Sequence, residues 1–389
     1  MSTNIIIGAD LVPTKSNYHL FELNKTEILL GEKLYAKLKS ADFTIFNLEV
    51  PLSDIESPIE KSGPHLIAPL NTIEGIKSIN PHFFTLANNH IYDQGEQGMN
   101  STIDILNKAG ISWAGVGKNL LEAKKPFITE IKGIKVGIYC CAEHEFSIAT
   151  EMSPGANPFD PLESLDHIAN LKQQCDYVIV LYHGGKEHYR YPSPYLQKVC
   201  RKIVEKGANL VACQHTHCIG CSEQWNNGTI VYGQGNFLFD YSNSDFWKTS
   251  LLVDIYLEKD SKGKVIDNVK YIPLSKKDEK VRIAEDEKKM ILSKFLERSS
   301  ELNDSEKLEE HYQEFANKLI YEYLNIFYGK KSLFFRIINK LSGYRFNAWY
   351  MSHRYKKEDK IKIKNCLGCE AHREVIMQGL YSNPINKKL

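Results

Sequence analysis

The stretch YVIVLYHGGKEHYRYPSPYLQKVCRKIVEKGANLVACQHTH (residues 177–217) predicts a strand, a helix and a second strand, and it decides the fold class. Its two ends are apolar runs of strand length, whereas residues 196–208 carry apolar side chains at helical spacing. The strands end in histidines, first His183 and then the pair His215 and His217. Because α/β sheets place ligand sites at the carboxyl ends of their strands, these imidazoles predict a shared site.

Three further apolar runs also lead to polar side chains. IIIGAD, FTIFNLE and FFTLANNH end in Asp10, in Glu49 and in the pair Asn89-His90. Imidazoles, carboxylates and a carboxamide oxygen are the ligands that hydrolytic metal pairs use. The sequence therefore predicts one metal site whose ligands are Asp10, Glu49, Asn89, His183, His215 and His217.

Each carboxylate has an alternative role when it is considered alone. A strand-end aspartate such as Asp10 often only caps a turn or a helix. Glu49 could equally pair with a lysine or an arginine, because a carboxylate after an apolar strand is costly to bury without a cation or hydrogen bonds. As a ligand, it could bridge two metals about 3.5–4 Å apart.

The pair His215 and His217 gives the strongest local signal. Side chains two residues apart in an extended segment project to one side, so both imidazoles would face one ion while Thr216 faces away. A lone histidine is more often a core or surface residue. This spacing after an apolar strand favours the metal-ligand role over that alternative.

Residues beside the predicted ligands suggest the rest of the site. The imidazole next to Asn89 can point toward a leaving group, and its ordinary pKa near neutrality suits His90 to the role of general acid. Asp93 is the second predicted catalytic residue, which would orient His90. The predicted pocket residues are Asn88, Gly184, Glu187, His188 and Asn236.

Residues 1–275 alternate between strand-like and helix-like patterns and also contain a hairpin predicted around Lys132-Gly133. This mixture suits sheets flanked by helices better than a simple Rossmann unit. After Pro273 the composition shifts toward lysine, glutamate and aspartate at helical spacing. We therefore expect an α/β domain at 1–275 and a mainly helical C-terminal extension at 276–389.

Residues 321–357 of the extension combine aromatic side chains with lysine and arginine. One interpretation is an amphipathic surface for a membrane or an anionic polymer. We favour the other, a helical appendage whose aromatic residues pack on the main domain, because helices bury such stripes routinely. Further on, Cys366, Cys369 and His372 form half of a zinc motif with no second half nearby, and a turn followed by a helix start explains them better.

Composition excludes several classes of protein. A net charge of +1 over 389 residues gives no global polycation for binding nucleic acid. No run approaches the roughly 18 apolar residues of a membrane span, and the first apolar run is too short for a signal peptide. Nine scattered cysteines indicate reduced, structural thiols. We expect a cytoplasmic chain, at most peripheral to a membrane, and composition leaves its oligomeric state open.

Four strings resemble, in order, the CapA family of capsule and poly-γ-glutamate synthesis proteins. They are NLEVPL (47–52), residues 86–119, residues 178–217 and VYGQGNFLFD (231–240). That family belongs to the calcineurin-like metallophosphoesterase superfamily, and the resemblance covers about residues 4–240. It implies a four-layer α/β/β/α sandwich with a dinuclear metal centre. The mixed nitrogen and oxygen ligands suit Mn, Fe or Zn better than Ca²⁺.

The resemblance also implies a role for each motif residue. Asp10 is similar to the first aspartate of the family, Glu49 to its bridging carboxylate and Asn89 to its metal-binding asparagine. His90 matches the catalytic histidine. The isolated and the paired histidine ligands correspond to His183, His215 and His217.

Three departures from the family pattern accompany the resemblance. The superfamily's first motif is Asp-x-His and its bridging residue is usually aspartate, whereas this chain has Val12 and Glu49 at these positions. The paired histidines usually read His-His-Pro-His, and Gln214 and Thr216 replace two of these residues. One of the two metal positions therefore lacks a ligand.

Two hypotheses for function follow from the resemblance. The first is a metal-dependent hydrolase in capsule or poly-γ-glutamate biosynthesis that attacks a phosphoester or a capsular-polymer bond. A metal-activated hydroxide would act with His90 as general acid, on an anionic polymer or phosphoester substrate. The alternative is a non-catalytic accessory subunit of a membrane complex for capsule synthesis or export, with a degenerate metal site. The missing histidine at position 12 motivates this alternative.

Overall fold

The computed structural model describes residues 2–240, 242, 244–277, 279–327 and 333–368. The chain divides into two compact units, Met1–Glu310 and His311–Leu389. The described strands and all the predicted site residues belong to the first unit.

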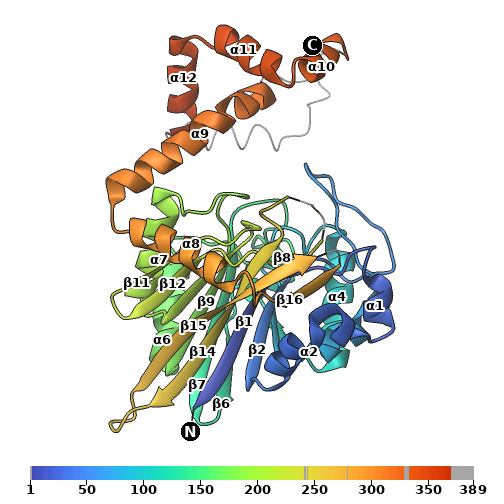
Figure 1. Ribbon diagram of the computed structural model, residues 1–389, viewed down its shortest axis with the longest axis vertical. Coiled ribbons are helices and arrows are strands. Elements are labelled where there is room, and N and C mark those ends of the chain that lie inside the picture. Colours follow the sequence, from blue (N-terminus) through green and yellow to red (C-terminus); the bar gives the residue numbers. More distant parts are fainter. Residues whose placement is uncertain (1, 241, 243, 278, 328–332, 369–389) are drawn as a thin grey trace. The chain divides into compact units, whose positions relative to one another are not determined.

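A large sheet forms one central layer of the first unit (Figure 1). Its strands in spatial order are β16 (Lys280–Ile283), β15 (Val265–Lys277), β14 (Thr249–Lys259), β1 (Thr3–Leu11), β2 (Phe43–Leu48), β3 (Phe83–Thr85) and β4 (Ser112–Ala114), with β13 (Asn236–Leu238) also paired to β1. The strands β1 to β4 are parallel, so their carboxyl ends meet at one edge of the sheet, whereas β14 to β16 run antiparallel.

A second sheet forms the other central layer. Its strands in spatial order are β11 (Ser222–Trp225), β12 (Gly228–Tyr232), β10 (Leu210–Gln214), β9 (Tyr177–His183), β7 (Ile134–Ala142) and β6 (Phe127–Ile131). The four inner strands are parallel and the two edge strands antiparallel. The predicted hairpin at Lys132-Gly133, which joins β6 to β7, is confirmed, and both turn residues have positive φ. A short pair, β5 (Val116–Gly117) with β8 (Gly155–Ala156), lies apart from both sheets.

Helices cover the outer face of each sheet, and Figure 1 shows the two sets on opposite sides of the sandwich. The large sheet is covered by α1 (Tyr18–Glu22), α2 (Thr26–Lys39), α3 (Ile73–Ser78) and α4 (Gly95–Ala109), and the second sheet by α6 (Ser164–Gln174) and α7 (Pro194–Glu205). One apolar cluster lies under each set of helices, and a third lies between the two sheets. The expected four-layer α/β/β/α sandwich is therefore confirmed.

Alternation along the strands determines which side chains reach the carboxyl edge between the sheets. In β2, Ile45 belongs to the cluster between the sheets and Phe46 to the cluster under the helices. Since successive side chains point to opposite faces, Asn47 and Glu49 follow Ile45 on the inner side. The same alternation in β9 leads from apolar residues between the sheets to His183.

The first unit extends past position 275, where the composition changes. β15 crosses this position, β16 pairs with β15, and α8 (Lys288–Glu301) packs against β11 and β15. Arg298 Nε in α8 donates to the carbonyl oxygen of Gly220 at 2.8 Å, and Ser299 Oγ accepts from the N–H of Ser222 at 2.9 Å. Because β15 and β16 belong to the large sheet and α8 packs on strands of both sheets, the compact units divide at 310/311 rather than at 275.

The second unit is helical. It contains most of α9 (Ser305–Phe327), then α10 (Leu333–Leu341), α11 (Arg345–Arg354) and α12 (Lys357–Gly368). Its aromatic residues contact one another, since the ring centroid of Phe335 lies 5.0 Å from that of Phe346 and 5.1 Å from that of Tyr350. None of the helices that the described residues form has the length and apolar character needed for a membrane span. Cys369 and His372 of the half zinc motif lie outside the described residues.

Replacing Phe46 by alanine is expected to lower the free energy of unfolding by about 3–5 kcal/mol, because a fully buried ring would leave a cavity. Its ring packs against that of Phe237 at 4.8 Å between centroids, directly beneath the helices. Urea denaturation followed by circular dichroism measures the change. Leu162→Ala is the matched control, since Leu162 is 83% exposed and should shift the value by less than about 0.5 kcal/mol. Equal effects of the two changes would contradict this packing.

Candidate metal centre

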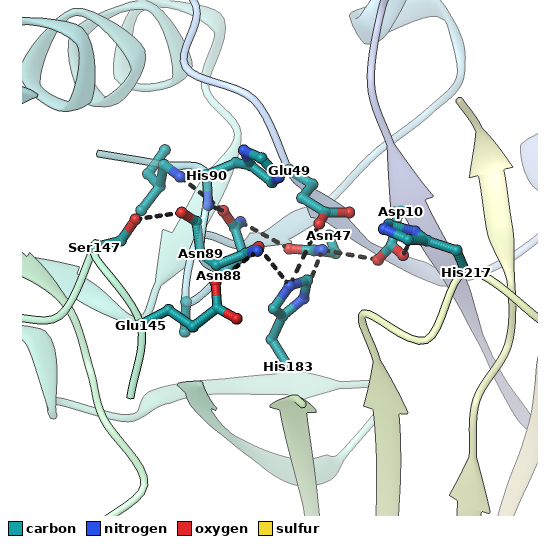
Figure 2. A network of polar contacts seen from close by, with 12 residues as sticks. Asp10, Asn47, Glu49, Asn88, Asn89, His90, Glu145, Ser147, His183 and His217 are labelled. Carbon is teal, nitrogen blue, oxygen red and sulfur yellow. Dashed lines mark hydrogen bonds and ion pairs between the residues drawn. The ribbon is translucent and has the colours of Figure 1, made fainter. Parts of the chain in front are cut away.

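The predicted ligands come together at the carboxyl edge of the two sheets, as Figure 2 shows for most of them. Asp10 lies near the end of β1, and Glu49 directly follows β2. His183 ends β9, and His215 directly follows β10. The carboxylates are fully buried and the imidazoles almost so. Parallel strands in both layers thus deliver these side chains to one buried place.

Asn47, which sequence reasoning missed, links the ligands of the two sheets (Figure 2). Its Nδ2 donates to Asp10 Oδ1 at 2.8 Å and lies 3.2 Å from His183 Nδ1. Its Oδ1 accepts a hydrogen bond from Asn88 Nδ2 at 3.0 Å. A signal was present, because Asn47 lies two residues before Glu49 in a strand and so shares its face.

His183 joins the carboxylates to the loop that follows β3. Its Nε2 lies 3.0 Å from Asn89 Oδ1 and 3.4 Å from Glu49 Oε1. The carboxamide of Asn89 is held from its other side, since Nδ2 donates to Glu145 Oε2 at 3.1 Å. Ser147 Oγ donates to the backbone carbonyl of Asn89 at 2.6 Å. The amide oxygen is therefore fixed toward His183, which is the orientation that a ligand needs.

Glu49, His215 and His217 form the tightest group. Each offers one ligand atom, and these three atoms all lie within 4.8 Å of one another. His217 Nδ1 lies 2.8 Å from Asn236 Oδ1 and 3.6 Å from Asp10 Oδ2. Because Asn236 and Asp10 engage Nδ1, Nε2 is the nitrogen of His217 that remains for another partner.

The backbone of the histidine pair differs from the extended segment expected from the sequence. β10 ends at Gln214, and both His215 (φ 87°) and His217 (φ 52°) adopt left-handed conformations. The expectation of an extended segment is therefore wrong, although Thr216 does turn its hydroxyl elsewhere, to the carbonyl of Cys218. Non-glycine residues at such angles cost on the order of 1–3 kcal/mol each and persist where the surroundings enforce them, as at binding sites.

Charges of opposite sign alternate in this buried cluster. Burial alone would lower the pKa of His217, but hydrogen bonding to Asp10 and the negative charges of Glu49 and Asp10 raise it to about 9. Burial likewise opposes charge on His183, yet Glu49 raises its pKa above the usual value. Burial and the neighbouring imidazoles hold the pKa of His215 well below its ordinary value. His217 and His183 in turn lower the pKa of Asp10 against the effect of burial.

The donor atoms of the cluster fit divalent cations. Asp10 Oδ2, both carboxylate oxygens of Glu49 and His215 Nδ1 are buried without a hydrogen bond among the described residues, although imidazoles lie 3.6 Å from Asp10 Oδ2 and 3.4 Å from Glu49 Oε1. Burying such groups unpaired costs on the order of 1–3 kcal/mol or more each. Coordination of a cation would satisfy all of them, and a set of oxygen and imidazole nitrogen atoms suits Mn, Fe or Zn.

His90 lies beside the cluster with its own partners. Its Nδ1 is 2.6 Å from Asp93 Oδ2, which also accepts from the N–H of Leu66 at 2.6 Å. The backbone N–H of His90 donates to Asn88 Oδ1 at 3.1 Å. Lys61, a second residue that sequence reasoning missed, forms a buried ion pair with Asp93 and approaches His90 Nδ1 at 3.3 Å. No pattern around Lys61 in the sequence signals this contact.

A pocket of about 450 Å³ opens beside these residues. Its lining includes Asn89, His90, His217, Glu187 and His188 from the sequence analysis, together with Lys61, Glu145 and Trp247. The other predicted pocket residues lie behind this lining. Asn88 accepts a hydrogen bond from the backbone N–H of His90, Asn236 contacts the imidazole of His217, and a Cβ on Gly184 would meet the side chain of Glu143 at 2.6 Å. His188 accepts a hydrogen bond from Trp247 Nε1 at 2.9 Å.

Val12 supplies no ligand to the cluster. It is 2% exposed and belongs to the apolar cluster under the helices. The side chain that the superfamily pattern places at this position is therefore absent from the site, as the sequence predicts.

Comparisons with known proteins agree with the resemblance. Residues 11–241 match the family model described as bacterial capsule synthesis protein PGA_cap. The capsule biosynthesis protein CapA of Bacillus anthracis is 29% identical over 244 residues, which cover 60% of this chain and 58% of that protein. The PGA biosynthesis protein CapA of Bacillus subtilis (strain 168) is 27% identical over 233 residues, covering 58% and 60%. The match thus spans about three fifths of these curated relatives.

Among solved structures, a phosphatase from Mycoplasma pneumoniae is similar, with 16% identity and a TM-score of 0.45 over 72% of this chain and 95% of that one.

The family model covers more than half of the chain, from the end of β1 to the residues that follow β13. The chain therefore belongs to the bacterial capsule synthesis protein PGA_cap family.

Proposed function

We propose that this chain is a metal-dependent hydrolase that acts in capsule or poly-γ-glutamate biosynthesis, on a phosphoester or a bond of an anionic polymer. The observation that supports this most directly is the set of buried ligand atoms on Asp10, Glu49 and His215 that make no hydrogen bond among the described residues. A merely structural polar cluster would satisfy its own hydrogen bonds. These atoms instead lie next to a pocket that His90 and His217 line.

Two divalent ions would be held by the six predicted ligands. Glu49, His215 and His217 are already grouped closely enough for one ion. Asp10, Asn89 and His183 lie around this group and would supply ligands for the second ion. Bound divalent ions acidify water and polarise the bond to be cleaved, which is the chemistry that such a pair supplies.

His90 would donate the proton to the leaving group. Asp93 engages Nδ1 and holds the ring, so Nε2 is the nitrogen that remains for the substrate. The ammonium group of Lys61 neutralises Asp93 within the pair and fixes it beside the ring. Asn88 fixes the backbone on which His90 lies, because its Oδ1 accepts the N–H groups of His90 and Ile91 at 3.1 and 2.8 Å. The chain's own residues thus hold one proton donor at the wall of the pocket.

A second candidate is a non-catalytic accessory subunit of a capsule-polymer synthesis or export complex at the membrane. The burial of Val12 in the apolar cluster favours it, because one cation position then has fewer protein ligands. In this case the cluster would bind cations weakly, and the protein's function in the complex would not depend on His90. Metal content separates the two candidates.

Elemental analysis of protein purified without chelators is expected to give about two divalent ions per chain. His217→Ala should reduce this ratio, because it removes an imidazole from the tightest ligand group. His144→Ala is the matched control, since His144 is exposed and outside the cluster. A ratio near zero in the unchanged protein would favour the accessory role.

His90→Ala should lower kcat about 10²–10⁴-fold on a phosphodiester with an alkyl leaving group, since this group needs a proton. The loss should be smaller with a nitrophenyl leaving group, which departs without one. Asp93→Asn should show the same dependence on the leaving group, because Asp93 acts through His90. Metal content should stay unchanged in both variants. An identical loss for both leaving groups would rule out the role of His90 as proton donor.

The affinity for divalent ions should rise with pH up to about pH 9. In the metal-free fold the pKa of His217 is raised from 6.5 to about 9, so a cation must displace its proton below that pH. The raised pKa also means that protonated His217 stabilises the metal-free fold fully below pH 6.5, and that this contribution is lost as the pH rises to about 9. Calorimetric titration with Mn²⁺ and thermal unfolding of the metal-free protein test both trends. Flat profiles for both would contradict them.

A further inference from the structure

A second pocket of about 530 Å³ adjoins the metal pocket. Phe239, Ser242 and Trp247 line both pockets, so they form a common wall between them. The remaining residues that line the second pocket are Asp240, Lys248, Ser275, Lys276, Lys277 and Glu287. Three of these are lysines, and none of the six predicted metal ligands is among them.

The two acidic residues that line this second pocket form no ion pair with its lysines. Both carboxylate oxygens of Asp240 accept hydrogen bonds from the hydroxyl groups of Thr14 and Ser16. Glu287 is exposed. Among the described residues neither carboxylate lies within ion-pair distance of a lysine of this pocket, and Lys248 pairs instead with Asp245, an exposed residue outside the lining, at 2.6 Å.

Lys276 is the innermost of the three cations. Its Nζ donates to the backbone carbonyl of Asn236 at 2.9 Å, and no carboxylate of the described residues lies within ion-pair distance of it. An ammonium group carries three donors, so donors remain for a ligand. Burial lowers the pKa of Lys276 to about 7, although the negative charges of Asp10 and Asp240 partly oppose this effect. An anion in the pocket would supply further negative charge.

The same residue connects the second pocket to the metal centre. Asn236, whose carbonyl accepts from Lys276, pairs through its side chain with His217 at 2.8 Å. β15 carries Lys276 and β13 carries Asn236, next to Asp10 in the register of β1. One extended ligand could therefore lie in both pockets, with Trp247 between them.

We propose that the second pocket is an anion subsite, in which Lys276, aided by Lys248 and Lys277, binds an oxyanion of a substrate chain whose neighbouring bond lies at the metal centre. The ligand class is a chain with repeated carboxylate or phosphate groups. A single small phosphoester would fill the metal pocket alone and would not need a second, lysine-lined pocket behind the same wall. This inference rests on the proposed function for the identity of the neighbouring site.

Binding of labelled oligomers to the full chain, measured by fluorescence anisotropy, tests the subsite. Two probes distinguish the source of the oxyanion, γ-glutamate oligomers for carboxylates and short polyphosphate for phosphates. Lys276→Met should weaken binding about tenfold or more, because it removes a charge-assisted bond in a partly buried place. Lys262→Met is the matched control, since Lys262 is exposed on the turn between β14 and β15 and lines neither pocket.

Loss of Lys276 could also weaken binding indirectly, by shifting Asn236 and with it His217. A second variant separates this effect from the loss of anion binding. The double change Lys248→Met and Lys277→Met leaves Lys276 in place, so it should weaken binding severalfold without altering metal content. Weakening for one probe alone identifies that anion as the ligand, and weakening for both supports oxyanions in general. The proposal is overturned if neither probe binds the unchanged chain, or if the pocket variants match Lys262→Met. Since binding is read without turnover, a lack of hydrolysis would count against the proposed function only.

Discussion

Burial of carboxylates and imidazoles between two apolar sheets is the constraint on which the site depends. Asp10 and Glu49 are fully buried. The free-energy cost of transferring an ionised carboxylate from water must be offset by opposite charge or by several hydrogen bonds. The protein supplies this in part, through Asn47 to Asp10 and through His183 and His217. Several oxygen and nitrogen atoms of the cluster still make no hydrogen bond among the described residues, and a bound cation would compensate their burial. The uncompensated burial and the proposed chemistry therefore lie at the same place.

Two kinds of backbone hold the predicted ligands in place, the ends of strands and a turn with left-handed residues. Asp10, Glu49 and His183 come from strand ends, where the sheet ladder fixes the backbone. His215 and His217 come from a left-handed turn after β10, which the surroundings must hold in place. Arg298 of α8 donates to Gly220 and Ile219, the residues that follow this turn. The positions of the paired histidines therefore depend on a helix far along the chain.

Periodicity predicts sheets flanked by helices and the convergence of the ligands, whereas the four-layer order is what the family resemblance implies. Apolar strands that end in polar residues place those residues at one edge, and the structure brings Asp10, Glu49 and His183 together there. Local periodicity carries no information on the turn of His215 or on the contact of Lys61 with Asp93, since tertiary packing decides both. The lysine-rich composition after Pro273 predicts a separate extension, whereas β16 and α8 belong to the first unit through their packing on its strands.

The region that matches the family ends at 241, yet the site is not complete at that point. β13 pairs with β1 at Asp10 and Leu11, but the part of β1 from Thr3 to Ile7 gains its second neighbour only from β14, beyond residue 241. Arg298 supports the turn of the paired histidines, and Lys276 reaches the backbone of Asn236 behind His217. The contacts of β14, Arg298 and Lys276 all come from residues after 241. The part of the chain beyond the matched region therefore contributes to the surroundings of the predicted metal ligands. The matched region would supply all but one of the predicted ligands, and the segment after it would supply contacts that hold their surroundings in place.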